Sequence, residues 1–197
     1  MGITSFSVEL IERNKGNAKS VIELGAQQMY NQSNLPAPYA DEFYKSLGFE
    51  EYSCIDLSKE NNAIEIDLSK ALETPIGHYD LVTDFGTSEH VGSNGAFDIK
   101  AYYNCWKIKH DLCKNGGLII SENPEPGSWP SHGFNYISQY FYVGLADKLD
   151  YTIIELSRYP AMGNQVDGWN TYCVLRKNSD AEFISLQDFK MLGVKRS

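Results

Sequence analysis

The chain is 197 residues long, and 17 lysines and arginines against 26 aspartates and glutamates give a net charge of −9. This length is sufficient for one domain with a sizeable core and hardly for two. A net negative charge repels a phosphate backbone, and no basic run precedes Lys195-Arg196, so the composition disfavours a nucleic-acid substrate.

The cysteines and the apolar segments bear on the compartment of the protein. Cys54, Cys105, Cys113 and Cys173 form no CxxC pair and no zinc-binding spacing, so we interpret them as buried small hydrophobic residues in a reducing compartment. Residues 1–14 include charges and lack the apolar core of a signal peptide. No stretch approaches the ~20 apolar residues of a membrane span. We therefore expect a cytoplasmic protein without membrane contact.

In the first half of the chain, helical and extended patterns alternate. Apolar residues at helical spacing predict a helix over 5–14 and another from near Pro38 to Gly48, where the glycine ends it. Short apolar runs suit strands that are buried on both faces, as in a parallel sheet covered by helices. The strands predicted in this way lie near 20–24, 51–57, 63–68 and 79–85.

The second half continues this alternation and ends in two strands. In chain order we predict a helix over 97–114, a strand over 117–121, a loop over 124–132, a helix over 133–147, strands over 151–158 and 172–177, and a helical tail over 185–192. A connection rich in Pro, Gly and Asn suits antiparallel pairing of the last two strands at the sheet edge. Cys54 and Cys173 then fall in strands, and Cys105 and Cys113 fall in one helix.

These elements predict one α/β domain over 1–197. It comprises a short N-terminal helix within 1–19, an α/β core over 20–178 and a C-terminal helical tail over 179–197. In an open α/β sheet, ligands bind beyond the carboxyl ends of the strands, so polar residues at those ends are expected to face one crevice. The strand ends carry Glu23-Leu24-Gly25, Asp56, Asp67 and Asp84.

This order of acids and glycine, from about Ser20 to Asn178, resembles class I S-adenosylmethionine-dependent methyltransferases. The resemblance implies a seven-stranded, mostly parallel sheet with helices on both faces, an antiparallel last strand and strand order 3-2-1-4-5-7-6. It also implies S-adenosylmethionine as cofactor, with Asp56 binding the ribose, Asp67 near the adenine amino group and Leu68 against the ring. The cofactor-binding residues implied are Glu23, Gly25, Gln27, Asp56, Leu57, Asp67, Leu68, Asp84, Phe85 and Gly86.

The segment Phe85-Gly86-Thr87-Ser88-Glu89-His90-Val91 resembles one that follows the fourth strand in some small class I methyltransferases, beneath the transferred methyl group. A histidine near its ordinary pKa of ~6.5 can take a proton at neutral pH, so His90 is the first candidate for a general base. Glu89 is a candidate either to orient an imidazole or to bind substrate. His132, beside Trp129, is the second candidate. The competing interpretation makes Glu89 and His90 supports of a loop and His132 a surface histidine.

The sequence gives no metal-binding signal, either at the remaining histidines or in the spacing of the three candidate catalytic residues. Glu89, His90 and His132 can meet in space, but their spacing matches no metal motif, so no metal is predicted. His78 and His110 are interpreted as ordinary turn and helix-surface residues.

The function that this resemblance implies is methyl transfer to a small polar acceptor, either a small molecule or a sugar or peptide group. Amino-methylating DNA enzymes resemble each other in an Asp/Asn-Pro-Pro-aromatic motif where this chain has Asp84-Phe85-Gly86-Thr87, which argues against DNA as the acceptor.

Two alternative functions stay open. Gln27 stands at the place of the family's second glycine, which favours a degenerate binding or assembly module. A dinucleotide-dependent oxidoreductase is a weaker alternative, because GxGxxG is absent. The short N-terminal segment also leaves room for a homodimer in which a second subunit completes the site.

Overall fold

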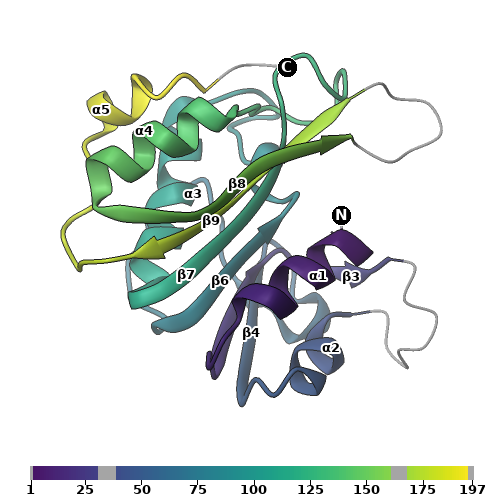
Figure 1. Cartoon of the computed structure of the whole chain (residues 1–197). Coiled ribbons are helices and arrows are strands. Elements are labelled where there is room, and N and C mark those ends of the chain that lie inside the picture. Colours follow the sequence, from purple (N-terminus) through teal and green to yellow (C-terminus); the bar gives the residue numbers. More distant parts are fainter. Residues whose placement is uncertain (1, 31–38, 161–167, 195–197) are drawn as a thin grey trace.

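The computed structural model describes residues 2–30, 39–160 and 168–194, and within these ranges the chain folds around a seven-stranded sheet (Figure 1). All neighbouring strands pair in parallel, except that β9 is antiparallel to both β7 and β8. Numbered along the chain within this sheet, the order is 3-2-1-4-5-7-6, so the predicted fold class, order and antiparallel last strand are confirmed. From one edge to the other, the strands are β5 (Ile64–Glu65), β4 (Glu51–Asp56), β2 (Ser20–Leu24), β6 (Tyr79–Phe85), β7 (Cys113–Pro124), β9 (Trp169–Lys177) and β8 (Tyr151–Pro160).

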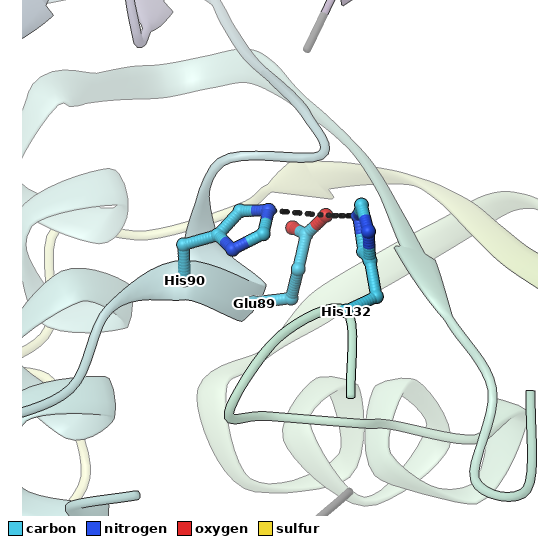
Figure 2. Close-up of side chains that lie close together, drawn as sticks. All are labelled: Glu89, His90 and His132. Carbon is cyan, nitrogen blue, oxygen red and sulfur yellow. Dashed lines mark ion pairs between the residues drawn. The ribbon is translucent and has the colours of Figure 1, made fainter. Parts of the chain in front are cut away.

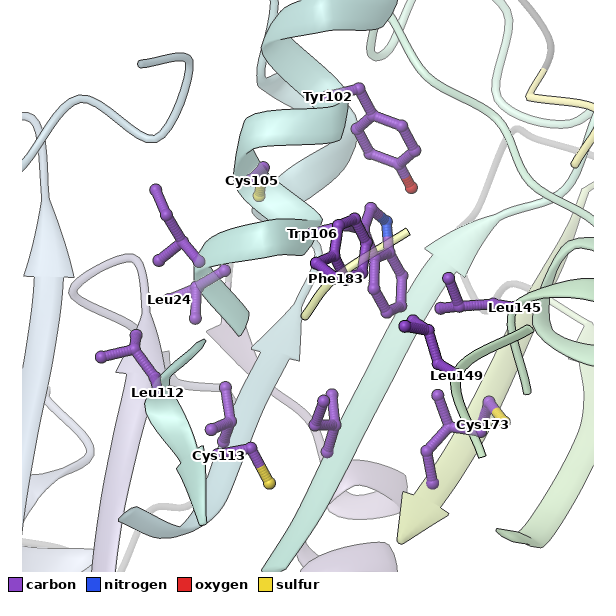
Figure 3. Packing of buried hydrophobic residues seen from close by; sticks show 14 of the residues in the cluster. Leu24, Tyr102, Cys105, Trp106, Leu112, Cys113, Leu145, Leu149, Cys173 and Phe183 are labelled. Carbon is purple, nitrogen blue, oxygen red and sulfur yellow. The ribbon is translucent and has the colours of Figure 1, made fainter. Parts of the chain in front are cut away.

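Helices cover both faces of this sheet, as predicted (Figure 1). One face carries α3 (Ile99–Leu112), α4 (Gln139–Leu149) and α5 (Leu186–Lys190), and the other carries α1 (Ser5–Asn14) and α2 (Asp41–Ser46). Side chains alternate along a strand, so Ile22 of β2 packs in the core with α3 and α4, whereas Val21 packs in the core with α1 and α2. Figure 3 shows the first of these cores, in which Trp106 of α3 lies near Leu145 and Leu149 of α4.

Two helices begin at capping side chains that their sequences supply. The hydroxyl of Thr4 accepts a hydrogen bond from the backbone N–H of Ser7, and the Ser7 hydroxyl accepts one from the N–H of Thr4, which satisfies two otherwise free donors of α1. Asp98 caps α3 by accepting from the N–H groups of Lys100 and Ala101. The cap places the start of α3 two residues after the predicted start at Phe97.

The end of α3 differs from the prediction. The helix stops at Leu112, and Cys113 has extended backbone (φ −82°, ψ 126°) and pairs with Tyr79 as the first residue of β7. The prediction that Cys113 is helical was therefore wrong, because pairing with β6 stabilises the extended conformation. All four cysteines are free and buried, as expected.

His110, near the end of the same helix, is buried rather than on the helix surface. One ring nitrogen is hydrogen-bonded to the Tyr151 hydroxyl (2.6 Å) and the other to the backbone carbonyl of Ala181 (2.8 Å). These partners come from distant segments, so the earlier interpretation of His110 as a surface residue was wrong.

Other helix and strand boundaries also differ from the predicted ones. The helix predicted over 133–147 begins only at Gln139, the strand predicted over 63–68 shortens to β5, and β7 extends to Pro124. The predicted start of the second helix near Pro38 lies outside the described residues. The elements that were not predicted are the parallel pair β1 (Gly2–Ile3) and β3 (Gln28–Met29) and the 3₁₀ turns η1 (Glu60–Asn62) and η2 (Ser88–His90).

Within the ranges that the structure describes, no helix has the length and apolar character needed to cross a membrane.

Candidate functional site

A cavity of about 190 Å³ lies at the carboxyl ends of β2, β4 and β5. This is the edge at which open α/β sheets bind their ligands. A wider groove of about 600 Å³, which includes His110, lies between α3 and the segment after β9, away from these strand ends. The smaller cavity is lined by Gly25, Ile55, Asp56, Leu57, Ile66, Asp67, Leu68, Ser69, Thr87, His90, Val91 and Gly92.

Two of the four predicted acids, Asp56 and Asp67, line this cavity. The Asp56 carboxylate accepts hydrogen bonds from the backbone N–H of Ala26 (2.9 Å) and from Ser58 (3.0 Å), so it connects the end of β4 to the loop after β2. Burial opposes ionisation of Asp67, but hydrogen bonds from Ser69 and Lys70 outweigh it and lower the pKa of Asp67. Both acids therefore stand at the cavity with their carboxylates held by neighbouring groups.

Gly25 lies where the chain leaves β2, and its backbone requires glycine. Its φ is +79°, and a Cβ there would stand 2.6 Å from Oγ1 of Thr87 and 2.8 Å from Nε2 of Gln27. Thr87 lines the cavity on this side and donates to the carbonyl of Leu24 (2.7 Å). Thr87 was not among the site residues that the sequence predicted, because a threonine after a strand carries no specific binding signal.

Gln27 lies in the loop after β2, at the position where the resemblance implies a second glycine. Its side-chain amide donates to the carbonyl of Leu24 (3.0 Å) and to Oγ1 of Thr87 (2.7 Å). Its Oε1 is buried and receives no hydrogen bond from the described part of the chain. Gln27 thus lies beneath the cavity wall and is absent from its lining.

The other two predicted acids are not brought to the cavity. Glu23 is fully buried beneath α2, where it accepts hydrogen bonds from Tyr44 and Tyr52, and burial raises its pKa from 4.5 to about 8. Asp84 is fully buried in an ion pair with Lys109. Of the remaining predicted cofactor residues, Leu57 and Leu68 line the cavity, whereas Phe85 and Gly86 do not.

The three predicted catalytic residues come together beside the cavity (Figure 2). Glu89 and His90 belong to η2, and His132 comes from the loop after β7. Oε1 of Glu89 lies 3.6 Å from Nε2 of His90 and 3.7 Å from Nε2 of His132. His90 also lines the cavity, and burial, the largest influence, lowers its pKa below 6.5. The cluster therefore adjoins the cavity at His90.

The loop that carries His132 is fixed against η2 by several hydrogen bonds. The backbone carbonyl of Glu89 accepts from the N–H groups of Phe134 (2.7 Å) and Asn135 (3.0 Å). The Tyr136 hydroxyl donates to the carbonyl of Trp129 (2.7 Å) and accepts from the N–H of His132 (3.2 Å). These contacts explain why residues 133–138 are not helical, although the sequence predicted a helix there.

No family model matches the chain, and no curated protein matches its sequence. Solved structures match its fold. The 1,6-didemethyltoxoflavin-N1-methyltransferase of Burkholderia thailandensis, with bound 1,6-didemethyltoxoflavin and S-adenosylhomocysteine, aligns with a TM-score of 0.61 and 14% identity over 89% of this chain and 78% of that chain. The N-methyltransferase NodS from Bradyrhizobium japonicum WM9, in complex with S-adenosylhomocysteine, aligns with a TM-score of 0.57 and 10% identity over 88% and 85%. TehB from Haemophilus influenzae aligns with a TM-score of 0.60 and 12% identity over 87% and 62%.

The sheet topology agrees with these neighbours and differs from the dinucleotide-binding alternative. Dinucleotide-binding sheets have the typical order 3-2-1-4-5-6, whereas here antiparallel β9 lies between β7 and β8. The chain therefore has the fold of class I S-adenosylmethionine-dependent methyltransferases.

Proposed function

We propose that this protein transfers the methyl group of S-adenosylmethionine to a small polar acceptor. The observation that carries the proposal is the cavity at the carboxyl ends of β2, β4 and β5, in a sheet of methyltransferase order, with Asp56 and Asp67 in its wall. Ligands of open α/β sheets bind at this edge. The acids stand after the second and third strands of the sheet, in the order that the family resemblance implies.

The residues in the cavity wall fit the chemical groups of the cofactor. Asp56 offers carboxylate oxygens to the two ribose hydroxyls, and charge strengthens such hydrogen bonds. Asp67 offers an acceptor to the adenine amino group, and buried Leu68 offers an apolar surface to the ring.

The size of the cavity matches part of the cofactor. Ligand pockets typically measure ~300–1,000 Å³, so about 190 Å³ suits the adenosine portion. The rest would extend past Gly25 and Thr87. When bound, the cofactor supplies an electrophilic methyl group. Glu89, His90 and His132 lie beside this end and would position the acceptor and stabilise its charge.

Charge and fold neighbours support the acceptor class. The net charge of −9 disfavours a phosphate backbone as partner. One neighbour of the same fold holds the small molecule 1,6-didemethyltoxoflavin. A small molecule is therefore favoured over a sugar or peptide group, and a homodimer that completes the site stays a prediction.

Calorimetric titration with S-adenosylmethionine and S-adenosylhomocysteine tests this proposal. We expect the parent to bind both and Asp56→Ala to bind roughly ten- to a hundred-fold more weakly, because a charge-assisted hydrogen bond contributes about 1.5–3 kcal/mol. Asp188→Ala, which removes a half-exposed carboxylate on α5, is the matched control and should bind as the parent does.

Two results would count against the proposal. If the parent binds neither compound, the cofactor assignment fails and the degenerate binding module becomes the better explanation of Gln27 at the glycine position. If the parent binds but Asp56→Ala binds equally well, the cofactor lies elsewhere than at the end of β4.

A further inference from the structure

Two distances within the cluster of Glu89, His90 and His132 are close to those between ligands of one cation. Oε1 of Glu89 stands 3.6 and 3.7 Å from the two Nε2 atoms, and one ligand atom from each residue falls within 4.8 Å of the others. Both distances exceed the ~2.7–3.2 Å of an N–H···O hydrogen bond. Two nitrogen or oxygen ligands at ~2.0–2.2 Å from a tetrahedral Zn²⁺ are roughly 3.3–3.6 Å apart. Figure 2 shows the Glu89 carboxylate between the two imidazoles, with its Oε1 facing both Nε2 atoms.

Because the Glu89 carboxylate is buried, a positive charge between it and the two imidazoles would stabilise it. The residue is only 2% exposed, and its Oε2 accepts one long hydrogen bond from Nδ2 of Asn123 (3.3 Å). Its Oε1 faces Nε2 of His90 and Nε2 of His132. A buried carboxylate is stable only when it is paired or coordinates a metal. Asn123 also orients the carboxylate, as the partners of metal ligands do.

The backbone holds the ligands in place without any ion. Phe134 and Asn135 donate to the carbonyl of Glu89, and Nδ2 of Asn135 donates to the carbonyl of Val91 (2.7 Å). Gly133 allows this close approach, since a Cβ there would stand 2.9 Å from the carbonyl oxygen of Glu89. Ligands that are fixed in advance lose little entropy when they bind an ion.

From this geometry we infer that Glu89, His90 and His132 form a binding site for one divalent transition-metal cation of the Zn²⁺ class. Two imidazoles and one carboxylate suit such ions, whereas Mg²⁺ and Ca²⁺ prefer oxygen ligands. Three protein ligands leave a coordination position open, as in catalytic rather than structural sites. The histidine side chains are 35% and 41% exposed, so the open position is accessible beside the cavity.

The role of this cation, unlike its binding, rests on the proposed function. An acceptor hydroxyl or amine at the open position would have a lowered pKa and release its proton to water. The freed lone pair would then form the new bond to the methyl carbon while the carbon–sulfur bond breaks and the sulfonium becomes a thioether. In this arrangement the imidazoles act as ligands through Nε2, and neither one serves as the general base that the sequence suggested.

Titration of the EDTA-treated, desalted full-length protein with Co²⁺, followed by visible absorption, tests the site directly. We expect bands of four- or five-coordinate Co²⁺ that saturate at one equivalent and disappear when Zn²⁺ is added. Glu89→Gln, His90→Gln and His132→Gln should each weaken Co²⁺ binding at least tenfold, because each removes a ligand. His78→Gln, at an exposed histidine outside the cluster, is the matched control and should bind as the parent does.

The outcomes separate this inference from the proposed function. Absence of one-equivalent binding in the parent, or equal binding in all three variants, would overturn the metal site even if S-adenosylmethionine binds. Co²⁺ binding that survives Asp56→Ala, in a protein that fails to bind S-adenosylmethionine, would leave the metal site standing and reject the methyltransferase. Where Glu89→Gln fails to fold by circular dichroism, His132→Gln, on a half-exposed side chain, decides the result.

Discussion

Glu23 lies near the ligand-binding edge of the sheet, but its carboxyl group is buried in the core. Its carboxyl group accepts hydrogen bonds from the hydroxyls of Tyr44 (3.3 Å) and Tyr52 (3.0 Å) and from the backbone N–H of Gln27 (3.2 Å). Burial is the largest influence on this group and raises its pKa from 4.5 to about 8. At neutral pH the side chain is therefore mostly protonated, and it connects β2 to α2 and β4 as a neutral hydrogen-bonding group.

This pKa predicts how stability changes with pH. Between about pH 4.5 and 8 the folded protein holds a proton on Glu23 that the unfolded chain has released, so the free energy of unfolding falls as pH rises through this window. At pH 7 the loss is on the order of 3 kcal/mol. Glu23→Gln is neutral at every pH, so we expect it to be more stable than the parent at pH 7 and about equal at pH 4.5. Urea unfolding at both pH values measures the difference, with Glu50→Gln at an exposed glutamate as control. A stability difference that does not change with pH would contradict the assignment.

The direction of a strand-end side chain is what the sequence could not predict. The order of the acids correctly marked the carboxyl edge of the sheet, and Asp56 and Asp67 line the cavity there. Asp84 turns inward because Lys109, twenty-five positions along the chain, reaches it from α3. No spacing rule contains such a partner, so the role of each acid became visible only in the folded structure.

At the scale of elements, η2 and the loop between β7 and α4 together build the cluster of Glu89, His90 and His132. Periodicity predicted the strands well, because runs buried on both faces have a strong local signal. It failed over 133–138, where long-range hydrogen bonds to the carbonyl of Glu89 replace the helical pattern. The proximity of His132 to Glu89 and His90 depends on these same bonds, which is why the spacing of the three residues in the sequence gave no sign of a metal site.

Tyr136 offers a test of the loop between β7 and α4. Its hydroxyl accepts hydrogen bonds from the N–H groups of His132 (3.2 Å) and Gly133 (3.1 Å) and donates to the carbonyl of Trp129 (2.7 Å). Tyr136→Phe leaves the N–H of Gly133 without its partner, whereas the N–H of His132 keeps its hydrogen bond to the carbonyl of Trp129 (3.1 Å). We therefore expect a loss of about 1–3 kcal/mol in the free energy of unfolding. Co²⁺ affinity should fall with it, whereas affinity for S-adenosylmethionine should stay unchanged.

The matched control for this variant is Tyr140→Phe, which removes a hydroxyl from a highly exposed tyrosine on α4. It should leave stability and both affinities at parental values. If Tyr136→Phe weakens Co²⁺ and cofactor binding equally, the loop does not act on His132 alone, and the separation of the cluster from the cofactor cavity is wrong.

At the scale of the whole molecule, one buried ion pair connects the helical layer to the ligand-binding edge. Lys109 of α3 and Asp84 of β6 are both fully buried, and the ammonium also lies 3.7 Å from the centre of the Trp106 ring. Burial alone would raise the pKa of Asp84, but the charge and hydrogen bond of Lys109 outweigh it and lower the pKa. Asp84 in turn accepts from the N–H groups of Thr87 and Ser88, which fixes the turn that carries Glu89 and His90.

Removal of Lys109 should therefore affect the whole fold and not one site. Lys109→Met leaves the Asp84 carboxylate buried without its cation, and breaking such a pair costs about 3–5 kcal/mol. Lys107→Met, two residues away on the same helix, breaks an exposed pair with Asp111 and should cost less than ~1 kcal/mol. Urea unfolding of both variants at pH 7 measures the difference in their free energies of unfolding. Asp84→Asn combined with Lys109→Met should recover part of the stability lost in Lys109→Met, because no buried unpaired charge then remains. Equal stability of Lys109→Met and Lys107→Met would show that Asp84 does not depend on Lys109, and that the turn bearing Glu89 and His90 is held by its own hydrogen bonds.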